Sequence, residues 1–309
     1  MARFGRFAAA LGLAAAVLSA AVPTSALSAS AVEIPTALGS VAIPAAPRRV
    51  AVYDVPAVDT LARLGVRPAG LPARLYVPEL EPLAKAAAPV GTIHEPDLEA
   101  LSALAPDLTI VGGRSSTKLA SVRQVGPAID MSLDGANLLP NLRSQLAAYG
   151  RLFGREAEAQ AATAELDAAV AATRAAAQGK GNALIVMTNG PRLSAYGPGS
   201  RFGWLHTDLG LPAAVPNLQA AIHGEVISFE FIRKADPDWL IVLDRTTAIG
   251  EAGGNARATL DNELVAQTTA GRKGQILLLP PADFYIAAGG FSATLRVLAR
   301  IRDGFLAAR

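Results

Sequence analysis

The sequence predicts an α/β protein of two lobes, with mostly parallel sheets, joined by one long helix. Three observations support this prediction. Short apolar segments alternate with helical segments on both sides of the middle of the chain, residues 138–179 are rich in helix-forming residues, and a short motif occurs once on each side of that stretch. Alternation of short strands and helices is typical of parallel sheets, because a crossover must carry the chain back to the start of each parallel strand.

The middle stretch, residues 138–179, has its apolar residues at helical spacing and contains no proline after its third residue. Alanine, leucine, glutamate, glutamine and arginine dominate it, and all of them favour helices. Asn137 can cap its start, and Gly179 ends it. At about 1.5 Å per residue, roughly 40 residues span about 60 Å, which exceeds the width of a small domain. We therefore predict one helix that links two lobes, with Gly150 or Gly154 at any kink.

The first lobe, residues 31–137, opens with a hairpin over residues 32–43 and continues with strands that alternate with helices. The expected strands are short apolar runs at 50–53, 66–71, 108–111 and 128–133. The expected helices carry apolar residues on one side and cover 55–65, 96–105 and 117–125.

The second lobe, residues 180–309, restarts the same alternation. Its expected strands cover 183–187, part of 188–198, 239–243 and 275–279. Its expected helices cover 203–210, 229–234, 260–268 and 291–306. The chain thus divides into two similar halves around the central helix.

A short motif is repeated in the two lobes. A glutamate on a short expected helix, Glu99 in the first lobe and Glu230 in the second, lies seven positions before a Pro-Asp pair that opens a buried strand. Chance is one explanation, because helix–proline–strand junctions are common. Two copies that flank one long helix favour a duplication, and the two glutamates then occupy equivalent positions.

The first 30 residues have the order of a secretory signal peptide: Arg3 and Arg6, an apolar run over 7–22, and then small residues. The run is shorter than the roughly 20 apolar residues of a membrane span, so an uncleaved anchor is the weaker alternative. No cysteine is present, which excludes disulfides, cysteine-based metal sites and a lipidated N-terminal cysteine. We therefore expect a soluble periplasmic protein that is not lipidated.

The charge of the chain is nearly balanced. Arg3 and Arg6 account for two of the 28 basic residues, and without them the basic residues equal the 26 acidic ones. A neutral chain gives no argument for binding nucleic acid, so any positive site must be local.

Ligands of open α/β sheets bind beyond the carboxyl ends of the strands, so the polar residues there are the candidates for a site. They are Tyr53, Asp54, Arg114, Arg201, His223, Arg245 and Tyr285. Three arginines in such loops favour an anionic ligand. A histidine with a tyrosine favours a metal, and tyrosine binds ferric iron only as the phenolate, so the ion must lower its pKa from about 10.

Each candidate also has a structural interpretation. The arginines can be surface residues, and Arg245 can pair with Asp244 or Glu251. His223 can be a hydrogen-bonded loop residue, and Tyr285 can belong to the core. The two other histidines, at positions 94 and 206, fit structural roles better. No nucleophile elbow, P-loop or zinc-protease motif is present, so we expect no enzyme.

Beyond its first 30 residues, the chain resembles the periplasmic binding proteins of iron–siderophore ABC importers, a helical-backbone class in which one long helix joins two lobes. The matching stretches are 49–65, 92–114 and 223–245. The last of these, together with 260–265 and the Phe284-Tyr285 pair, is most similar to the catecholate-siderophore binders.

The resemblance implies roles for specific residues. Arg114, Arg201 and Arg245 match the arginines that hold the anionic complex. His223 and Tyr285 match a histidine and a tyrosine that complete the iron shell when the siderophore supplies only four donor atoms. One acidic residue of each lobe docks on the permease, and the repeat selects Glu99 and Glu230, with Glu95 and Glu225 as neighbouring alternatives.

The expected function is capture of a ferric catecholate-type siderophore between the lobes and its delivery to an inner-membrane ABC importer. The resemblance implies a monomer, no intrinsic cofactor, and an Fe(III)–siderophore complex as the ligand. A haem- or corrinoid-binding protein of the same fold is the alternative. A secreted hydrolase would need a nucleophile–base pair, which the sequence does not offer, and an exported protein without a role in iron is the remaining interpretation. Which siderophore binds stays open.

Overall fold

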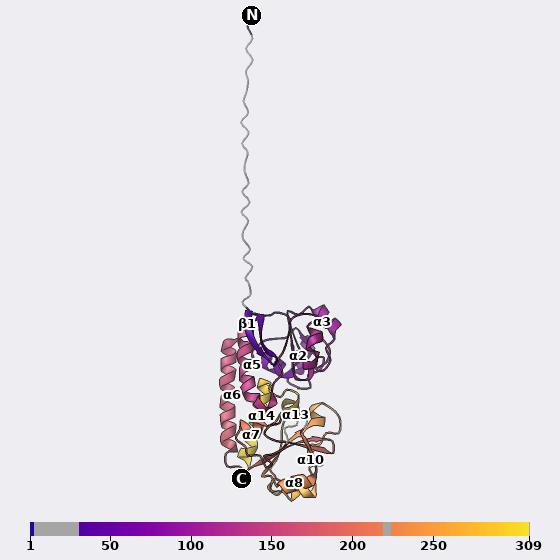
Figure 1. Cartoon of the computed structure of the whole chain (residues 1–309), viewed down its shortest axis with the longest axis vertical. Helices are drawn as coiled ribbons and strands as arrows, with labels where there is room; N and C mark the ends of the chain where they lie inside the picture. Colours follow the sequence, from indigo (N-terminus) through magenta and orange to yellow (C-terminus); the bar gives the residue numbers. More distant parts are fainter. Residues whose placement is uncertain (3–30, 219–223, 309) are drawn as a thin grey trace.

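The computed structural model of the chain describes residues 1–2, 31–218 and 224–308. The predicted signal peptide thus lies almost entirely outside the described residues. The described part forms two α/β lobes, each built on a five-stranded sheet, with long helices along one side (Figure 1). No helix in these ranges is long and apolar enough to cross a membrane.

The N-lobe has an all-parallel sheet in the order β5-β4-β3-β6-β7, preceded by an antiparallel hairpin of β1 and β2. Its elements, in chain order, are β1 (Ala31–Thr36), β2 (Gly39–Pro44), β3 (Val50–Val52), α1 (Val55–Arg63), β4 (Gly70–Leu71), α2 (Glu81–Ala86), β5 (Ala88–Pro89), α3 (Leu98–Leu104), β6 (Leu108–Val111), the 3-10 helix η1 (Gly113–Lys118), α4 (Leu119–Val122), β7 (Ala128–Asp130) and the 3-10 helix η2 (Gly135–Asn137).

The C-lobe sheet has the order β10-β9-β8-β11-β12, in which β8, β11 and β12 are parallel and β9 and β10 add an antiparallel edge. Its elements are β8 (Ala183–Asn189), β9 (Arg192–Tyr196), α7 (Trp204–Thr207), β10 (Glu225–Ile227), α8 (Phe229–Ala235), β11 (Trp239–Asp244), α9 (Arg245–Ala248), α10 (Ala256–Thr259), α11 (Glu263–Ala266), α12 (Thr269–Lys273), β12 (Ile276–Leu278), α13 (Pro281–Tyr285) and α14 (Phe291–Ala307). The prediction of two lobes with mostly parallel sheets is confirmed.

The prediction of one continuous helix over residues 138–179 is wrong. Two helices occupy this stretch, α5 (Leu138–Phe153) and α6 (Glu156–Ala177), and Gly154 ends the first in the left-handed conformation at φ +62°. Helix formers continue on both sides of Gly154, so the sequence pattern does not mark the reversal. A glycine in this conformation is a common helix terminus, because it carries no Cβ to clash.

The two helices form an antiparallel hairpin rather than a kinked rod. Arg143 of α5 pairs with Asp167 of α6 at 2.7 Å. Near the turn the helices are so close that a methyl group on Gly150 would lie 2.8 Å from the Cβ of Ala159. At 1.5 Å per residue, the 22 residues of α6 span about 33 Å, and Figure 1 shows α6 running beside both lobes. The long helix that joins the lobes is therefore α6 alone.

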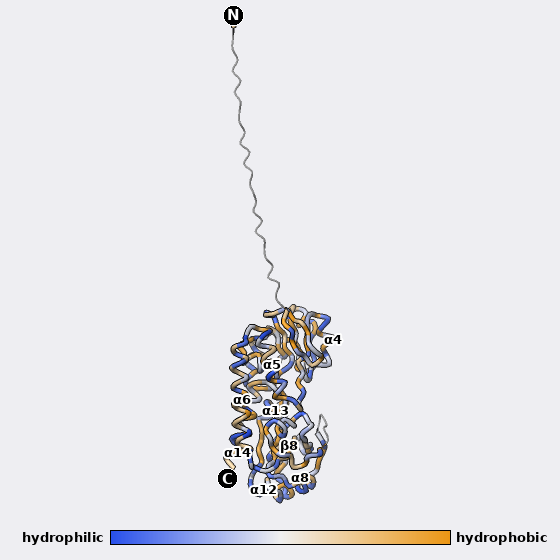
Figure 2. Tube along the Cα trace, turned by 60° about the vertical axis from the view of Figure 1, so that its left-hand side comes forward, coloured by the Kyte–Doolittle hydropathy of each residue, from blue (hydrophilic) through white to orange (hydrophobic). Residues whose placement is uncertain are grey.

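The apolar core is continuous from one lobe to the other. One cluster of buried side chains includes Val52 in the N-lobe sheet, Leu166 in α6, Ile241 in the C-lobe sheet and Phe305 in α14. Figure 2 shows the corresponding hydrophobic segments running through the interior of both lobes. Bending between the lobes would expose part of this apolar surface to water, so we expect the lobes to close by only a small movement.

A second connection between the lobes joins α1 to the start of α14. The Thr60 hydroxyl accepts a hydrogen bond of 3.2 Å from the Phe291 amide, and the Asp59 carboxylate accepts one of 3.1 Å from the Ala293 amide. Arg296, one turn further along α14, binds Asp283 of α13 with contacts of 2.8 and 2.6 Å. Side chains of the N-lobe thus satisfy the free amide groups at the N-terminus of a C-lobe helix.

The helices α3 and α8 repeat each other in structure as well as in sequence. Each has seven residues, begins after a capping side chain and ends at a non-glycine residue in the left-handed conformation. The aspartate of the Pro-Asp pair after each helix makes the same kind of contact. Asp107 accepts hydrogen bonds from the Arg48 and Arg49 amides just before β3, and Asp238 accepts one from the Asn182 amide just before β8. Glu99 and Glu230 are each the second residue of their helix.

Candidate functional site

Three arginines from separate segments meet around one tyrosine between the lobes. Arg114 comes from η1, directly after β6 of the N-lobe. Arg201 lies in the loop after β9, Arg245 is the first residue of α9 after β11, and Tyr285 is the last residue of α13. The guanidinium carbons of the arginines lie 5.1, 5.0 and 5.9 Å from the centre of the Tyr285 ring, in the order Arg114, Arg201 and Arg245.

Arg114 connects the two lobes directly. From the N-lobe, its guanidinium donates a hydrogen bond of 2.8 Å to the carbonyl oxygen of Tyr285 and one of 3.2 Å to that of Ile286. Burial, followed by the charge of Arg201, lowers the pKa of Arg114, but a guanidinium remains protonated in proteins. A half-buried positive charge is therefore held at the boundary between the lobes.

Arg201 and Arg245 approach the same ring from within the C-lobe. Arg201 donates a hydrogen bond of 3.4 Å to the Tyr285 carbonyl and stacks over Phe202 at 4.8 Å. The Nε of Arg245 donates one of 3.2 Å to the Tyr285 hydroxyl, and its Nη1 donates one of 3.2 Å to the Oδ1 of Asn189. None of the three arginines forms an ion pair within the described ranges, so their charges remain available to an anion.

The pKa of Tyr285 is lower than that of an ordinary tyrosine. Burial alone would raise this pKa, but the hydrogen bond and charge of Arg245 and the charges of Arg201 and Arg114 outweigh burial. The three arginines thus favour the phenolate, which is the form that binds ferric iron. Tyr285 packs against the apolar core, as its core interpretation expects, but its side chain is only partly buried and also lines a cavity.

The cavity beside these residues has a volume of about 600 Å³ and takes its walls from both lobes. The N-lobe contributes His94, Arg114, Leu133 and Asp134 to the wall. The C-lobe contributes Gly199, Ser200, Arg201, Tyr285 and Ala288. Asp134 is the one carboxylate among these lining residues. Its two oxygens accept hydrogen bonds, one of 3.0 Å from the Ala136 backbone amide and one of 2.6 Å from the Asn137 side-chain amide. With Arg114 and Arg201 against this one aspartate, the wall carries a net positive charge.

Three predicted candidates do not line the cavity: Arg245, which contacts the lining residue Tyr285 instead, and Tyr53 and Asp54. Tyr53 is buried, and its hydroxyl donates a hydrogen bond of 2.8 Å to the Val90 carbonyl. Asp54 caps α1 by accepting a hydrogen bond of 3.1 Å from the Ala57 amide, and burial raises its pKa to about 7. Both side chains turn inward, which their position after β3 alone does not reveal.

The histidines fall into three cases. His223 lies outside the described residues, so its metal role stays a prediction. His206 is buried, and its Nδ1 lies 2.9 Å from the Leu211 carbonyl oxygen, in agreement with a structural role. His94 was expected to be structural as well, but it is exposed and lines the cavity. His94 could not be singled out from the sequence, because β5, the two-residue strand that ends five residues before it, is not among the expected strands.

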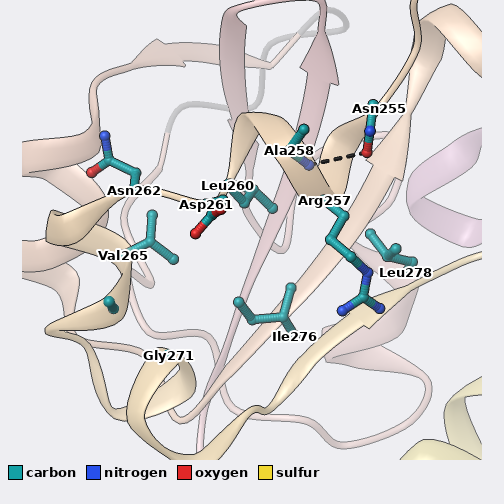
Figure 3. A pocket seen from close by; sticks show the side chains of 11 residues that line it. Asn255, Arg257, Ala258, Leu260, Asp261, Asn262, Val265, Gly271, Ile276 and Leu278 are labelled. Carbon is teal, nitrogen blue, oxygen red and sulfur yellow. Dashed lines mark hydrogen bonds between the residues drawn. The ribbon is translucent and has the colours of Figure 1, made fainter.

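A second hollow, of about 530 Å³, lies entirely in the C-lobe (Figure 3). Its polar side chains include Asn255, Arg257, Asp261 and Asn262. Both asparagines cap helices, since Asn255 accepts a hydrogen bond of 3.0 Å from the Ala258 amide and Asn262 accepts one of 2.9 Å from the Leu264 amide. With a single arginine beside an aspartate, this hollow suits an anionic ligand less well than the interlobe cavity does.

The part of the chain that the structure describes contains no group of three or more histidine, cysteine, aspartate or glutamate side chains placed to hold a metal.

Comparisons with known proteins agree with this architecture. The family model described as periplasmic binding protein matches residues 26–282. The petrobactin-binding protein of Bacillus subtilis strain 168 is 32% identical over 266 residues, which cover 85% of this chain and 84% of that protein.

Two solved structures are also similar. The periplasmic catecholate-siderophore binding protein of Vibrio cholerae is 30% identical, with a TM-score of 0.83 over 88% of this chain and 99% of that one. A siderophore-binding protein bound to two molecules of acinetobactin and ferric iron is 28% identical, with a TM-score of 0.80 over 89% of this chain and 98% of that one. From the family match and the shared fold, we conclude that the chain belongs to the periplasmic binding protein family.

Proposed function

We propose that this protein captures a ferric catecholate-type siderophore in the interlobe cavity and delivers it to an inner-membrane ABC importer. The observation that carries the proposal is the cluster of Arg114, Arg201 and Arg245 around Tyr285, without carboxylate partners, in a chain of nearly balanced charge. Ferric iron bound by two catecholates carries a net negative charge, and guanidinium groups stabilise such an anion.

The relatives support this class of ligand. Their names describe a petrobactin binder and a catecholate-siderophore binder, and one relative binds ferric iron with two siderophore molecules. All three are binding proteins, and on that basis we propose that the present chain performs no chemistry on its ligand.

The iron shell is the finer part of the proposal. A chelator with four donor atoms leaves two positions open on ferric iron, which prefers oxygen donors and accepts imidazole. We propose that the Tyr285 phenolate takes one of these positions and His223 the other. A six-donor siderophore fills the shell by itself and needs only the arginines.

The proposal also covers the export of the protein and its oligomeric state. Residues 1–30 act as a cleaved signal peptide, and the absence of any cysteine leaves no residue for N-terminal lipidation, so the mature protein acts in the periplasm. The mature chain acts as a monomer, and its balanced charge gives no argument for a nucleic-acid partner.

The direct test is a titration of the mature protein with a ferric bis-catecholate, followed by the quenching of tryptophan fluorescence. We expect tight binding for the natural chain and binding that is about tenfold weaker for Tyr285→Phe, because the variant loses an iron ligand but keeps the ring that the arginines surround. The visible absorption of the complex should change in the variant as well.

Equal affinity and spectra for the natural chain and Tyr285→Phe would remove this tyrosine from the iron shell and leave the arginines as the whole site. Absence of binding to any ferric catecholate would contradict the proposed function. A Soret band after addition of haem would then support the haem alternative.

Docking on the permease is assigned to Glu99 and Glu230. Both carboxylates are exposed, both occupy the second position of equivalent helices, and Figure 1 shows α3 and α8 at opposite ends of the molecule, one on each lobe. Glu95 is a weaker choice, since it already pairs with Lys118 at 2.6 Å. Glu225 is half-buried in the edge strand β10.

Changing both glutamates to glutamine should reduce uptake of the ferric siderophore by cells more than about tenfold without changing the affinity of the purified protein. Each lost carboxylate removes a charge from the docking surface but does not touch the cavity. Glu156→Gln serves as the matched control, because Glu156 is an exposed glutamate on α6. This variant should leave uptake unchanged. Normal uptake by the double variant would reject this docking surface.

A further inference from the structure

His94 lines the interlobe cavity from a tightly constrained turn. Gly91 begins the turn at φ +115°, where a side chain would lie 2.5 Å from the backbone of Glu95 and Asp97. The Thr92 hydroxyl accepts hydrogen bonds of 3.2 and 2.9 Å from the His94 and Glu95 amides, and the Thr92 amide donates one of 2.9 Å to the Glu95 carbonyl. The backbone that carries the imidazole is therefore held in one conformation.

The ring of His94 has no structural task in the described part of the chain. It forms no hydrogen bond or ion pair there, whereas the ring of His206, the other described histidine, binds the Leu211 carbonyl. The His94 side chain is exposed overall, but partial loss of hydration against the cavity wall, and after it the charge of Arg114, lowers its pKa. The neutral ring therefore prevails at neutral pH, with one N–H donor and one acceptor nitrogen.

His94 supplies the N-lobe wall with a kind of group that the arginines do not provide. Arg114, its charged neighbour on that wall, is already directed to the Tyr285 and Ile286 carbonyls. The C-lobe wall opposite contributes Arg201 and Tyr285. A chelate in this cavity thus meets the N–H donor of His94 on the N-lobe wall and the phenolate of Tyr285 on the C-lobe wall.

We propose that His94 is a ligand-contacting residue that donates a hydrogen bond from its imidazole N–H to a metal-bound oxygen of the ferric chelate. The inference rests on the proposed function and names a recognition residue for it on the N-lobe. The ligand class is an anionic complex with oxygen donors, because catecholate oxygens keep lone pairs after they bind iron and accept hydrogen bonds from outside the metal shell. The iron shell itself is not altered by this contact.

Three substitutions separate hydrogen bonding from other roles of the ring. His94→Ala removes the ring, His94→Phe keeps a flat ring without a donor, and His94→Gln keeps an N–H donor of similar reach. Glu95→Gln is the control for disturbance of the turn, because Glu95 is the next residue and its exposed carboxylate points to Lys118. Each purified variant is titrated with a ferric bis-catecholate, and both the affinity and the visible absorption of the complex are recorded.

We expect about tenfold weaker binding for His94→Ala and His94→Phe, and binding within about threefold of the natural chain for His94→Gln and Glu95→Gln. The visible absorption should change far less in these four complexes than in the complex of Tyr285→Phe, since no iron ligand is lost.

Unchanged affinity in His94→Ala would overturn the inference, and so would natural affinity in His94→Phe, which would indicate stacking alone. A spectral change in His94→Ala as large as that in Tyr285→Phe would show that the ring binds the iron instead, and would also overturn it. These outcomes all leave tight binding by the natural chain, whereas failure of the natural chain to bind would overturn the proposed function itself.

Discussion

Replacing Arg114 with alanine should weaken binding of a ferric bis-catecholate about 100-fold, a larger loss than for either other arginine of the cluster. Two contributions disappear together. The ligand loses a charge-assisted contact worth about 1.5 kcal/mol or more, and the lobes lose the two hydrogen bonds, of 2.8 and 3.2 Å, that Arg114 makes to the Tyr285 and Ile286 carbonyls. A combined loss of about 3 kcal/mol corresponds to the expected 100-fold change.

Two matched variants make this prediction specific. Arg245→Ala should cost at least about 1.5 kcal/mol, or roughly tenfold, because both hydrogen bonds of Arg245 stay within the C-lobe. Arg257→Ala should have no effect, because Arg257 lines the separate hollow of Figure 3. The measurement is again fluorescence quenching by the ferric complex. Equal losses for Arg114 and Arg245 would show that the interlobe contact adds nothing, and a loss in Arg257→Ala alone would move the site to the other hollow.

Most of the architecture could be predicted because its signals are local. Apolar runs such as residues 108–111 and 239–243 are buried on both faces of their sheets, and such strands read as continuous apolar segments. The repeat was visible because Asp107 and Asp238 perform the same backbone task in each lobe. These features depend on residues that are neighbours in the sequence, so no knowledge of tertiary contacts is needed to find them.

The reversal between α5 and α6 could not be predicted in the same way. Gly154 is compatible with a kink, a cap or an interrupted helix, and what selects the hairpin is the packing of Gly150 on Ala159 and the pairing of Arg143 with Asp167. Those contacts join residues that are far apart along a straight helix. Tertiary packing therefore decides between conformations that the local sequence leaves equally acceptable.

The site shows the same division. Arg114, Arg245 and Tyr285 follow the carboxyl ends of β6, β11 and β12, so their place after expected strands was enough to select them as candidates. Tyr53 also follows a strand but is buried, and His94 lines the cavity after β5, a two-residue strand that the sequence pattern does not reveal. The direction of a side chain after a strand depends on the turn that follows, and this is set by contacts distant in sequence.

Replacing Arg296 with methionine should lower the free energy of unfolding by about 3–5 kcal/mol at pH 7.5. Arg296 binds Asp283 through two hydrogen bonds, of 2.8 and 2.6 Å, and lies 4.0 Å from Asp59. The side chains of Asp59 and Asp283 are only 2% and 7% exposed. Without the guanidinium, two buried carboxylates face each other with no positive partner, and the contact that ties α1 to α13 and α14 loses its charge balance.

Because the cost arises from ionised carboxylates, it should shrink as the pH falls. Burial already raises the pKa of Asp59 from 3.8 to about 6, although Arg296 and the Ala293 amide lower it, so loss of Arg296 raises it further. When a carboxyl group has a raised pKa in the folded state, the protein loses stability as the pH rises through that pKa and regains it as the pH falls. Urea unfolding followed by tryptophan fluorescence should therefore show a clearly smaller difference between Arg296→Met and the natural chain at pH 5 than at pH 7.5.

Arg302→Met, which removes an exposed pair with Asp303 on the same helix, should change stability by less than about 1 kcal/mol at both pH values. A loss in Arg296→Met that is equally large at pH 5 would mean that side-chain packing, rather than the buried charges, accounts for the stability that Arg296 provides.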